Sequence, residues 1–180
     1  MKSILFSVFI IAMLFVGCKN EKSVDDLNVV KSEAVDNSFK VTVNVIAKKD
    51  DDFSLFYSED GTTNFSAKPI WQKVKGNDVE QSLVYTLPEE VYPTELRLDF
   101  GLNKVQEDIV LKGLVLEYKG KTKLIAGPEL GKYFRADQNK CTFDPATGVI
   151  KALVTNGERQ GPSLYPHETV LKPEMEKLAK

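Results

Sequence analysis

Hydrophobic and polar residues alternate along much of the chain beyond residue 38. In the segment FKVTVNV, from Phe39 to Val45, apolar side chains occupy every second position and polar ones stand between them. This period of two is typical of a β-strand that buries one face. In a later segment, ELRLDFG, Arg97 and Asp99 fall on the face opposite to the apolar stripe. The same alternation predicts strands over residues 39–47, 53–58, 80–88 and 95–101.

The segment 109–118, IVLKGLVLEY, is apolar enough to form a strand, but the parity of its apolar positions changes in the middle. Leu111 is odd-numbered, whereas Leu114 is even-numbered. One extra residue in a strand produces such a shift, and glycine tolerates the backbone angles that it requires. The segment therefore predicts either a β-bulge at Lys112-Gly113 or a strand that is buried on both faces.

Turn signals separate these strands. Lys119-Gly120 predicts a hairpin turn into residues 122–126. The sequence DPATG, residues 144–148, predicts a second hairpin because proline fixes one backbone angle and glycine permits a positive φ. Helix is limited to short segments at 128–134 and from Pro173 onwards. About eight or nine short strands with few helices predict an all-β fold, an antiparallel β-sandwich of the jelly-roll kind, over residues 39–180.

The first residues have the pattern of a secretory signal peptide, which we assign to residues 1–17. Lys2 gives a basic start, residues 4–16 form a short apolar segment, and the small residue Gly17 follows. The apolar segment is shorter than the ~20 residues that a transmembrane helix needs, so cleavage is expected. Residues 18–38 are polar and mixed in charge, which predicts a flexible tether before the folded domain.

The sequence Val16-Gly17-Cys18 resembles the lipobox of bacterial lipoproteins, in which the thiol is diacylated and the new N-terminus is acylated after cleavage. The usual pattern has leucine three residues before the cysteine, where this chain has Phe15. The resemblance implies lipidation at Cys18, and more than one acyl chain gives stable anchoring. By the same resemblance to Gram-negative lipoproteins, Lys19 in place of aspartate implies sorting to the outer membrane, on its periplasmic or its exposed side. A plain signal peptide with an unmodified Cys18 is the alternative.

Net charge and cysteine content limit the partners and the disulfides that are possible. The chain has 24 basic and 26 acidic residues, and loss of Lys2 with the signal peptide makes the net charge about −3. Binding to nucleic acid needs a clustered basic surface, so no nucleic-acid partner is expected. Once Cys18 is lipidated, Cys141 is the one remaining cysteine and has no partner for an intramolecular disulfide.

Four successive segments, FSLFYSEDG, VEQSLVYTLP, LRLDFG and DIVLKGLVLEYKGK, are similar to the accessory β-sandwich modules of bacterial cell-surface carbohydrate proteins. These modules are the galactose-binding-like and carbohydrate-binding-module-like sandwiches. The resemblance covers residues 52–126 and implies a sandwich fold with a carbohydrate-related role. Its motifs consist mostly of core alternation, and a sandwich hosts many unrelated functions, so they specify the fold better than a ligand.

A sugar-binding surface combines a flat aromatic side chain with polar groups, because sugars present apolar ring faces and many hydroxyls. Trp71, the only tryptophan, lies in KPIWQKVKG between predicted strands, where we expect a loop to present it. Arg97 and Asp99 supply polar groups. We therefore predict a ligand-binding site at Trp71, Arg97 and Asp99. The alternative is structural, with Trp71 at the edge of the core and the two charged residues in cross-strand ion pairs.

The remaining reactive side chains do not form a recognisable catalytic or metal-binding motif, and no catalytic residue, metal site or cofactor is assigned. His167, the only histidine, has no identifiable nucleophile beside it, and Ser163 in GPSLYP is not in a nucleophile elbow. No enzyme activity is therefore expected. Carboxylates lie on both sides of residues 53–58, where a structural Ca²⁺ is an open alternative to a role in turns: Asp50, Asp51, Asp52, Glu59 and Asp60.

These patterns together predict a non-catalytic lipoprotein of the cell envelope, held at the membrane by its lipid anchor. We expect it to bind glycan or to support a surface carbohydrate-handling complex. The alternative is a protein-interaction or assembly module whose sandwich edges or faces dock an envelope protein.

Overall fold

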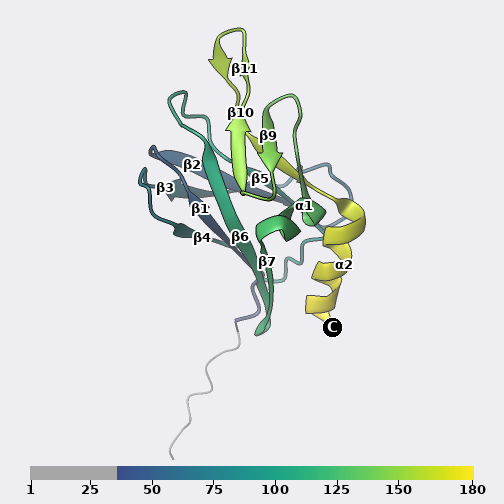
Figure 1. The fold of residues 1–180 in the computed structure, drawn as a ribbon. Coiled ribbons are helices and arrows are strands. Elements are labelled where there is room, and N and C mark those ends of the chain that lie inside the picture. Colours follow the sequence, from purple (N-terminus) through teal and green to yellow (C-terminus); the bar gives the residue numbers. More distant parts are fainter. Residues whose placement is uncertain (1–35) are drawn as a thin grey trace, which may run out of the picture. The chain divides into compact units, whose positions relative to one another are not determined.

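The computed structural model describes residues 36–180, which form two β-sheets packed face to face (Figure 1). The predicted all-β sandwich is thereby confirmed. The predicted signal peptide, the lipidation at Cys18 and nearly all of the predicted tether lie outside the described residues. Between residues 36 and 180, no helix is long and apolar enough to span a membrane.

The first sheet has the strand order β4-β1-β6-β10-β9, and β7 also pairs with β6. All of its pairings are antiparallel. The long strand β6 serves two neighbours on one edge, since β10 pairs with Ile109 and Val110 and β7 pairs with residues 113–118. The strands are β1 (Lys40–Ile46), β4 (Gln81–Thr86), β6 (Ile109–Tyr118), β7 (Lys121–Ala126), β9 (Cys141–Asp144) and β10 (Val149–Ala152).

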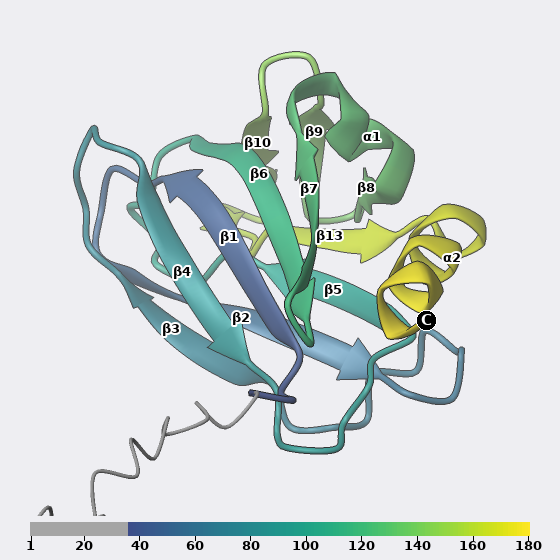
Figure 2. The same ribbon diagram turned by 90° about the horizontal axis from the view of Figure 1, so that it is seen from below.

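The second sheet has the strand order β3-β2-β5-β13-β8, again antiparallel throughout. Figure 2 shows it as the lower of the two layers, with β3 at one side and β13 towards the other. A separate small hairpin joins β11 (Val154–Thr155) to β12 (Glu158–Arg159). The strands of the second sheet are β2 (Asp51–Ser58), β3 (Ile70–Val74), β5 (Glu95–Asp99), β8 (Phe134–Ala136) and β13 (Ser163–Pro166).

The parity change in β6 is a β-bulge, as one of the two alternatives predicted. Asn44 pairs with Gly113, but the next residue of β1, Val45, pairs with Leu111, so Lys112 is the inserted residue. Lys112 is exposed, and the apolar positions on both sides of the bulge are buried, which rules out a strand buried on both faces. Glycine at 113 also suits its neighbour β7, because an added Cβ would lie 3.0 Å from the carbonyl oxygen of Ile125.

Both predicted hairpin turns are confirmed. Lys119 and Gly120 have φ angles of 49° and 76° between β6 and β7, the positive values that a tight two-residue hairpin requires. Gly148 has φ 75° just before β10, and its carbonyl accepts a 2.8 Å hydrogen bond from the N–H of Leu111. The second turn therefore holds the β9-β10 hairpin against β6.

The helices are short, and one of them begins earlier than predicted. A 3₁₀ turn η1 (Gly127–Glu129) and helix α1 (Leu130–Tyr133) confirm the helical segment at 128–134. Helix α2 (Glu168–Ala179) does not begin at Pro173 but contains it. Proline in a helix costs about 3 kcal/mol, and core packing offsets this because three side chains at helical spacing are buried: Leu171, Met175 and Leu178.

The hydrophobic core lies between the sheets and continues beneath α2. Phe53 and Phe100 pack edge to face with ring centroids 5.3 Å apart. Phe39, the first residue of the expected domain, is completely buried and packs edge to face on Tyr92 at 5.4 Å. The hydroxyl of Tyr92 donates to the carbonyl of Met175, which ties α2 to this end of the sandwich. The face of the second sheet that points away from the core is thereby left for other roles.

Candidate functional site

The outward face of the second sheet carries two of the predicted site residues in one row. Ser54 on β2 pairs with Trp71 on β3 and with Asp99 on β5, and Asp99 pairs with Ser163 on β13. Directly paired residues share a face, and neighbouring strands lie ~4.8 Å apart. These four side chains therefore form a continuous line across four strands.

Trp71 lies on edge strand β3, so the prediction that a loop presents it is wrong. Residues 70–74 pair with residues 51–55 of β2, and this pairing extends the strand into a segment with little alternation of its own. The indole is nonetheless 54% exposed and does not pack into the core. Together with Leu102, it lines two hollows of about 210 and 440 Å³. An exposed indole between two hollows offers a flat apolar surface to a ligand.

Arg97 and Asp99 project away from the core, as the alternation predicted, but they pair with each other on one strand and not across strands. The Arg97 guanidinium donates from Nε and Nη2 to the two carboxylate oxygens of Asp99, at 2.9 and 2.8 Å. It also lies 3.9 Å above the ring centre of Phe56. Burial lowers the pKa of Arg97, but the hydrogen bonds and charge of Asp99 outweigh burial and raise it.

This bidentate pair fixes the orientation of the Asp99 carboxylate, because both of its oxygens are held by a planar fork. Asp99 lines the 210 Å³ hollow together with Trp71, whereas Arg97 does not line it. The structure thus brings Trp71 and Asp99 to one cavity and places Arg97 behind Asp99 as a positioning residue.

Ser54 and Ser163 complete the floor of this cavity, and neither was predicted from the sequence. Both are about 1% exposed. The Oγ atom of Ser54 is buried and has no hydrogen-bond partner among residues 36–180. A buried hydroxyl without a partner costs about 1–3 kcal/mol, so a ligand hydroxyl that reached Ser54 would gain a hydrogen bond at a site already removed from water. The sequence signal for Ser54 was its position between the apolar residues Phe53 and Leu55, whereas Ser163 is placed on this face only by the pairing of β13 with β5.

The rim of the cavity comes from loops that follow the strands. Lys140, from the turn between β8 and β9, lines one side, and Gln160, after β12, lines another. Leu102, in the loop after β5, is 75% exposed and also lines the cavity, with its side chain next to Gly161. The cavity therefore combines two apolar surfaces with an amine, an amide, a carboxylate and two hydroxyls.

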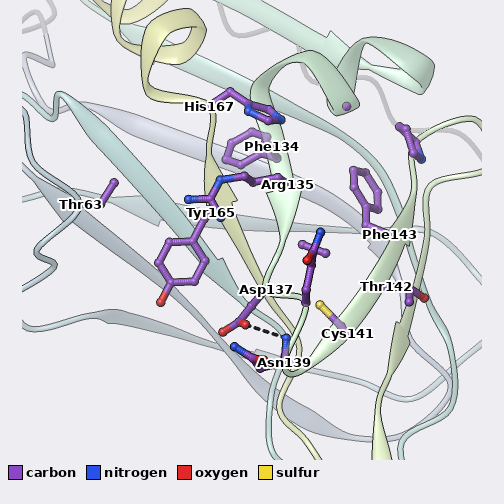
Figure 3. A pocket seen from close by; sticks show the side chains of 14 residues that line it. Thr63, Phe134, Arg135, Asp137, Asn139, Cys141, Thr142, Phe143, Tyr165 and His167 are labelled. Atoms are coloured by element: carbon purple, nitrogen blue, oxygen red, sulfur yellow. Dashed lines mark hydrogen bonds between the residues drawn. The ribbon is translucent and has the colours of Figure 1, made fainter.

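A larger groove of about 950 Å³ lies beyond the turn formed by residues 137–140 (Figure 3). Asp137 lines this groove, while Lys140 at the other end of the turn lines the smaller cavity. Arg135 and Tyr165 share one face because they are paired across β8 and β13, and His167 lies beside them. The two hollows are therefore neighbours, separated by a single turn.

A different residue of the outward face, Glu95, is completely covered. Its neighbour across the sheet is Ser58, and both carboxylate oxygens lack a hydrogen-bond partner in the described part of the chain. Burial, helped by the negative charge of Glu168 and opposed by Lys172, raises the pKa of Glu95 to about 7. Glu168 and Lys172 both belong to α2, so the position of this helix affects the pKa of Glu95.

The remaining reactive side chains have structural surroundings. His167 precedes α2, and its backbone N–H donates to the carbonyl of Tyr133 at 2.7 Å. Cys141 is buried, and its Sγ lies 3.4 Å from the carbonyl oxygen of Ser163. Burial raises the pKa of the Cys141 thiol, which disfavours the reactive thiolate.

The acidic residues considered for Ca²⁺ do not come together. Asp50, Asp51 and Asp52 lie at the start of β2, and Glu59 and Asp60 follow its end; among residues 36–180 no group of three or more histidine, cysteine or carboxylate side chains is placed to hold a metal ion. Asp50 accepts hydrogen bonds from the Gly76 N–H at 2.7 Å and from the Lys75 ammonium at 3.0 Å. At the other end, Asp60 accepts from the backbone and hydroxyl of Thr62 at 3.0 and 2.8 Å. These contacts are typical of turn formation.

The sequence therefore identified the exposed aromatic and the carboxylate of the smaller cavity, and the structure adds its two serines and its rim. Side-chain chemistry at this cavity suits a ligand with hydroxyl groups and an apolar face. Comparisons of this chain with protein-family models, with curated proteins and with solved structures give no match.

Proposed function

We propose that this protein binds glycan at the cavity that Trp71 and Asp99 line. One observation carries the proposal: an indole that is 54% exposed lines the same cavity as a carboxylate whose orientation is fixed by two hydrogen bonds. A sugar ring has an apolar face that stacks on an indole, while its hydroxyls donate to a carboxylate and exchange hydrogen bonds with serine. The same hollow supplies both kinds of contact.

Preorganisation favours binding at this site. Arg97 holds the Asp99 carboxylate, and Ser54 and Ser163 are buried on strands, so these three side chains lose little entropy when a ligand binds. The cavity of about 210 Å³ is smaller than the ~300–1,000 Å³ typical of small-molecule clefts. It fits one ring of a chain, and the second hollow on the other side of Trp71 is available to the next ring.

The proposal includes the setting that the sequence predicts. We propose a lipid anchor at Cys18, outer-membrane localisation and a non-catalytic role in surface carbohydrate handling. This part rests on the signal-peptide pattern, on the lipobox resemblance and on the resemblance of residues 52–126 to carbohydrate-binding modules.

The experiment is a screen of the purified chain against immobilised polysaccharides and a glycan array. Trp71→Ala should abolish retention on any glycan that the unmodified chain binds, and Trp71→Phe should restore part of it because an aromatic face remains. Leu124→Ala is the matched control, since Leu124 is also exposed, at 58%, but lies on β7 in the other sheet. Absence of retention on every envelope and dietary polysaccharide would overturn the proposal.

One observation favours the alternative function of a protein-interaction module. Leu102 and Val105, 75% and 68% exposed, lie in the loop beside the cavity, and exposed apolar side chains that gather beside a tryptophan mark protein-interaction surfaces. Crosslinking in intact cells followed by affinity purification distinguishes the two functions. A specific protein partner whose capture depends on Leu102, together with no glycan retention, would establish the alternative.

A further inference from the structure

A second row of side chains runs across the outward face next to the first. Phe56 pairs with Arg97, and Tyr165 pairs with Arg135. The two guanidinium groups lie over the Tyr165 ring, with Cζ atoms 5.3 and 5.6 Å from its centre. Tyr165 thus stands between two cations, of which Arg135 lines the larger groove and Arg97 lies behind Asp99 of the smaller cavity.

The two arginines differ in charge balance. Arg97 is neutralised by Asp99. Arg135 is exposed and forms no ion pair with any other residue from 36 to 180. The one acidic side chain that lines the 950 Å³ groove, Asp137, accepts a 3.0 Å hydrogen bond from the Asn139 N–H and lies 3.9 Å from the Lys140 ammonium. The groove therefore contains an uncompensated positive charge at Arg135.

An unpaired guanidinium in an open groove suits an anionic group. Its planar fork of N–H donors matches the geometry of a carboxylate or a sulfate, which it binds through two parallel hydrogen bonds. The Tyr165 ring lies on one side of the guanidinium, and both side chains line the groove (Figure 3). Arg135 is thus oriented without an acidic partner among residues 36–180.

The distance between the two hollows sets the size of the ligand. Trp71 and Arg135 are separated by four interstrand spacings and one residue pair along the strand, which amounts to roughly 20 Å. A single sugar cannot contact both, so a ligand that uses both is a chain that crosses the strands.

We propose that the ligand is an acidic glycan, in which one ring stacks on Trp71 and a carboxylate or sulfate of another ring pairs with Arg135. This inference rests on the proposed glycan binding and adds the chemical class of the glycan. Sugar acids and sulfated sugars share the anionic group that Arg135 recognises, and the experiment separates them.

The test uses three tetrasaccharides and isothermal titration calorimetry with the full mature chain. The first is tetragalacturonate, the second is its methyl ester, which keeps the shape and removes the charge, and the third is a sulfated galactan tetrasaccharide. Arg135→Gln removes the charge of the exposed arginine. Lys112→Gln is the matched control, because Lys112 is an exposed cation on the other sheet.

We expect at least one acidic tetrasaccharide to bind about tenfold more tightly than the methyl ester, the effect of one charge-assisted pair. Arg135→Gln should remove that preference, Lys112→Gln should keep it, and added salt should weaken it. Whether uronate or sulfate is preferred identifies the source of the anion.

The outcomes separate this inference from the proposed function. Equal binding of acidic and esterified ligands, abolished by Trp71→Ala, overturns the acidic-glycan inference and leaves glycan binding standing. A preference for the acid that survives Arg135→Gln overturns the assignment to this arginine. No binding of any tetrasaccharide overturns the acidic-glycan inference, and no binding of any glycan on the array overturns the proposed function as well.

Discussion

Substitution of Glu95 by glutamine should change how the stability of the protein depends on pH. The Glu95 carboxyl is completely buried on the outward face of β5, and neither oxygen has a hydrogen-bond partner in residues 36–180. Burial, helped by the negative charge of Glu168 and opposed by Lys172, raises the pKa of Glu95 from 4.5 to about 7. The folded protein therefore keeps a proton that the unfolded chain has released.

The sign and size of the effect follow from this difference. Between pH 4.5 and 7 the folded state binds more protons than the unfolded state, so the free energy of unfolding falls as pH rises. The stabilisation is complete below pH 4.5 and is lost as pH rises through the pKa of the folded state. A shift of this size corresponds to at most about 3 kcal/mol, which is roughly 6 to 12 °C in melting temperature for a domain of this size.

The assay is urea unfolding of Glu95→Gln and the unmodified chain at half-unit steps from pH 4 to 8.5. The two proteins should have similar stability near pH 4.5, where both side chains are neutral, and the variant should be more stable by up to about 3 kcal/mol at pH 8. Glu80→Gln, at an exposed carboxylate, is the control and should follow the unmodified chain. Parallel pH profiles for Glu95→Gln and the unmodified chain would refute a buried carboxyl with a raised pKa.

Three further predictions concern the fold, the site and the anchor. Gly148→Ala should lower the free energy of unfolding in urea by about 2 kcal/mol or more, because φ is 75° and an added Cβ would collide with the Leu111 carbonyl. The control Gly157→Ala, at φ 80° in open space, should lower it by about 1 kcal/mol. Equal losses for the two variants would be inconsistent with this packing. Arg97→Lys should weaken glycan binding about tenfold in calorimetry, because lysine cannot hold the carboxylate beside it with two bonds, and unchanged affinity would argue against a positioning role. Mass spectrometry of the native N-terminus should find a lipidated Cys18, and an unmodified cysteine or an intact Met1 would disprove the anchor.

Alternation in the sequence was sufficient to predict the long strands, because each carries several repeats of the period-two pattern. The same logic located the bulge beside Gly113, since one inserted residue reverses the parity of everything after it. Strands of three or four residues, such as 134–136 and 163–166, carry too few repeats, and their pairing depends on neighbours that are distant in sequence. Strand β3 was missed for a related reason, because its conformation follows from pairing with β2.

Other features depend on tertiary contacts that a linear pattern does not contain. Pro173 is a sound marker for a helix start in isolation, but buried Leu171 and Met175 hold an earlier turn in helical form. Glu95 has the parity of the outward face, so its burial follows only once α2 is placed. At the site, the face of Asp99 was predictable, whereas its juxtaposition with Trp71 required the register of three strands.

The fluorescence of Trp71 reports directly on glycan binding at the proposed cavity, because this is the only tryptophan in the chain and it lines that cavity. In the free protein the 54% exposed indole should emit at long wavelength and be quenched by iodide. Addition of a glycan retained in the affinity screen should shift the emission to shorter wavelength and protect the indole from iodide, with a midpoint equal to the calorimetric Kd. Glycan binding that leaves both the emission and the quenching of Trp71 unchanged would contradict the account.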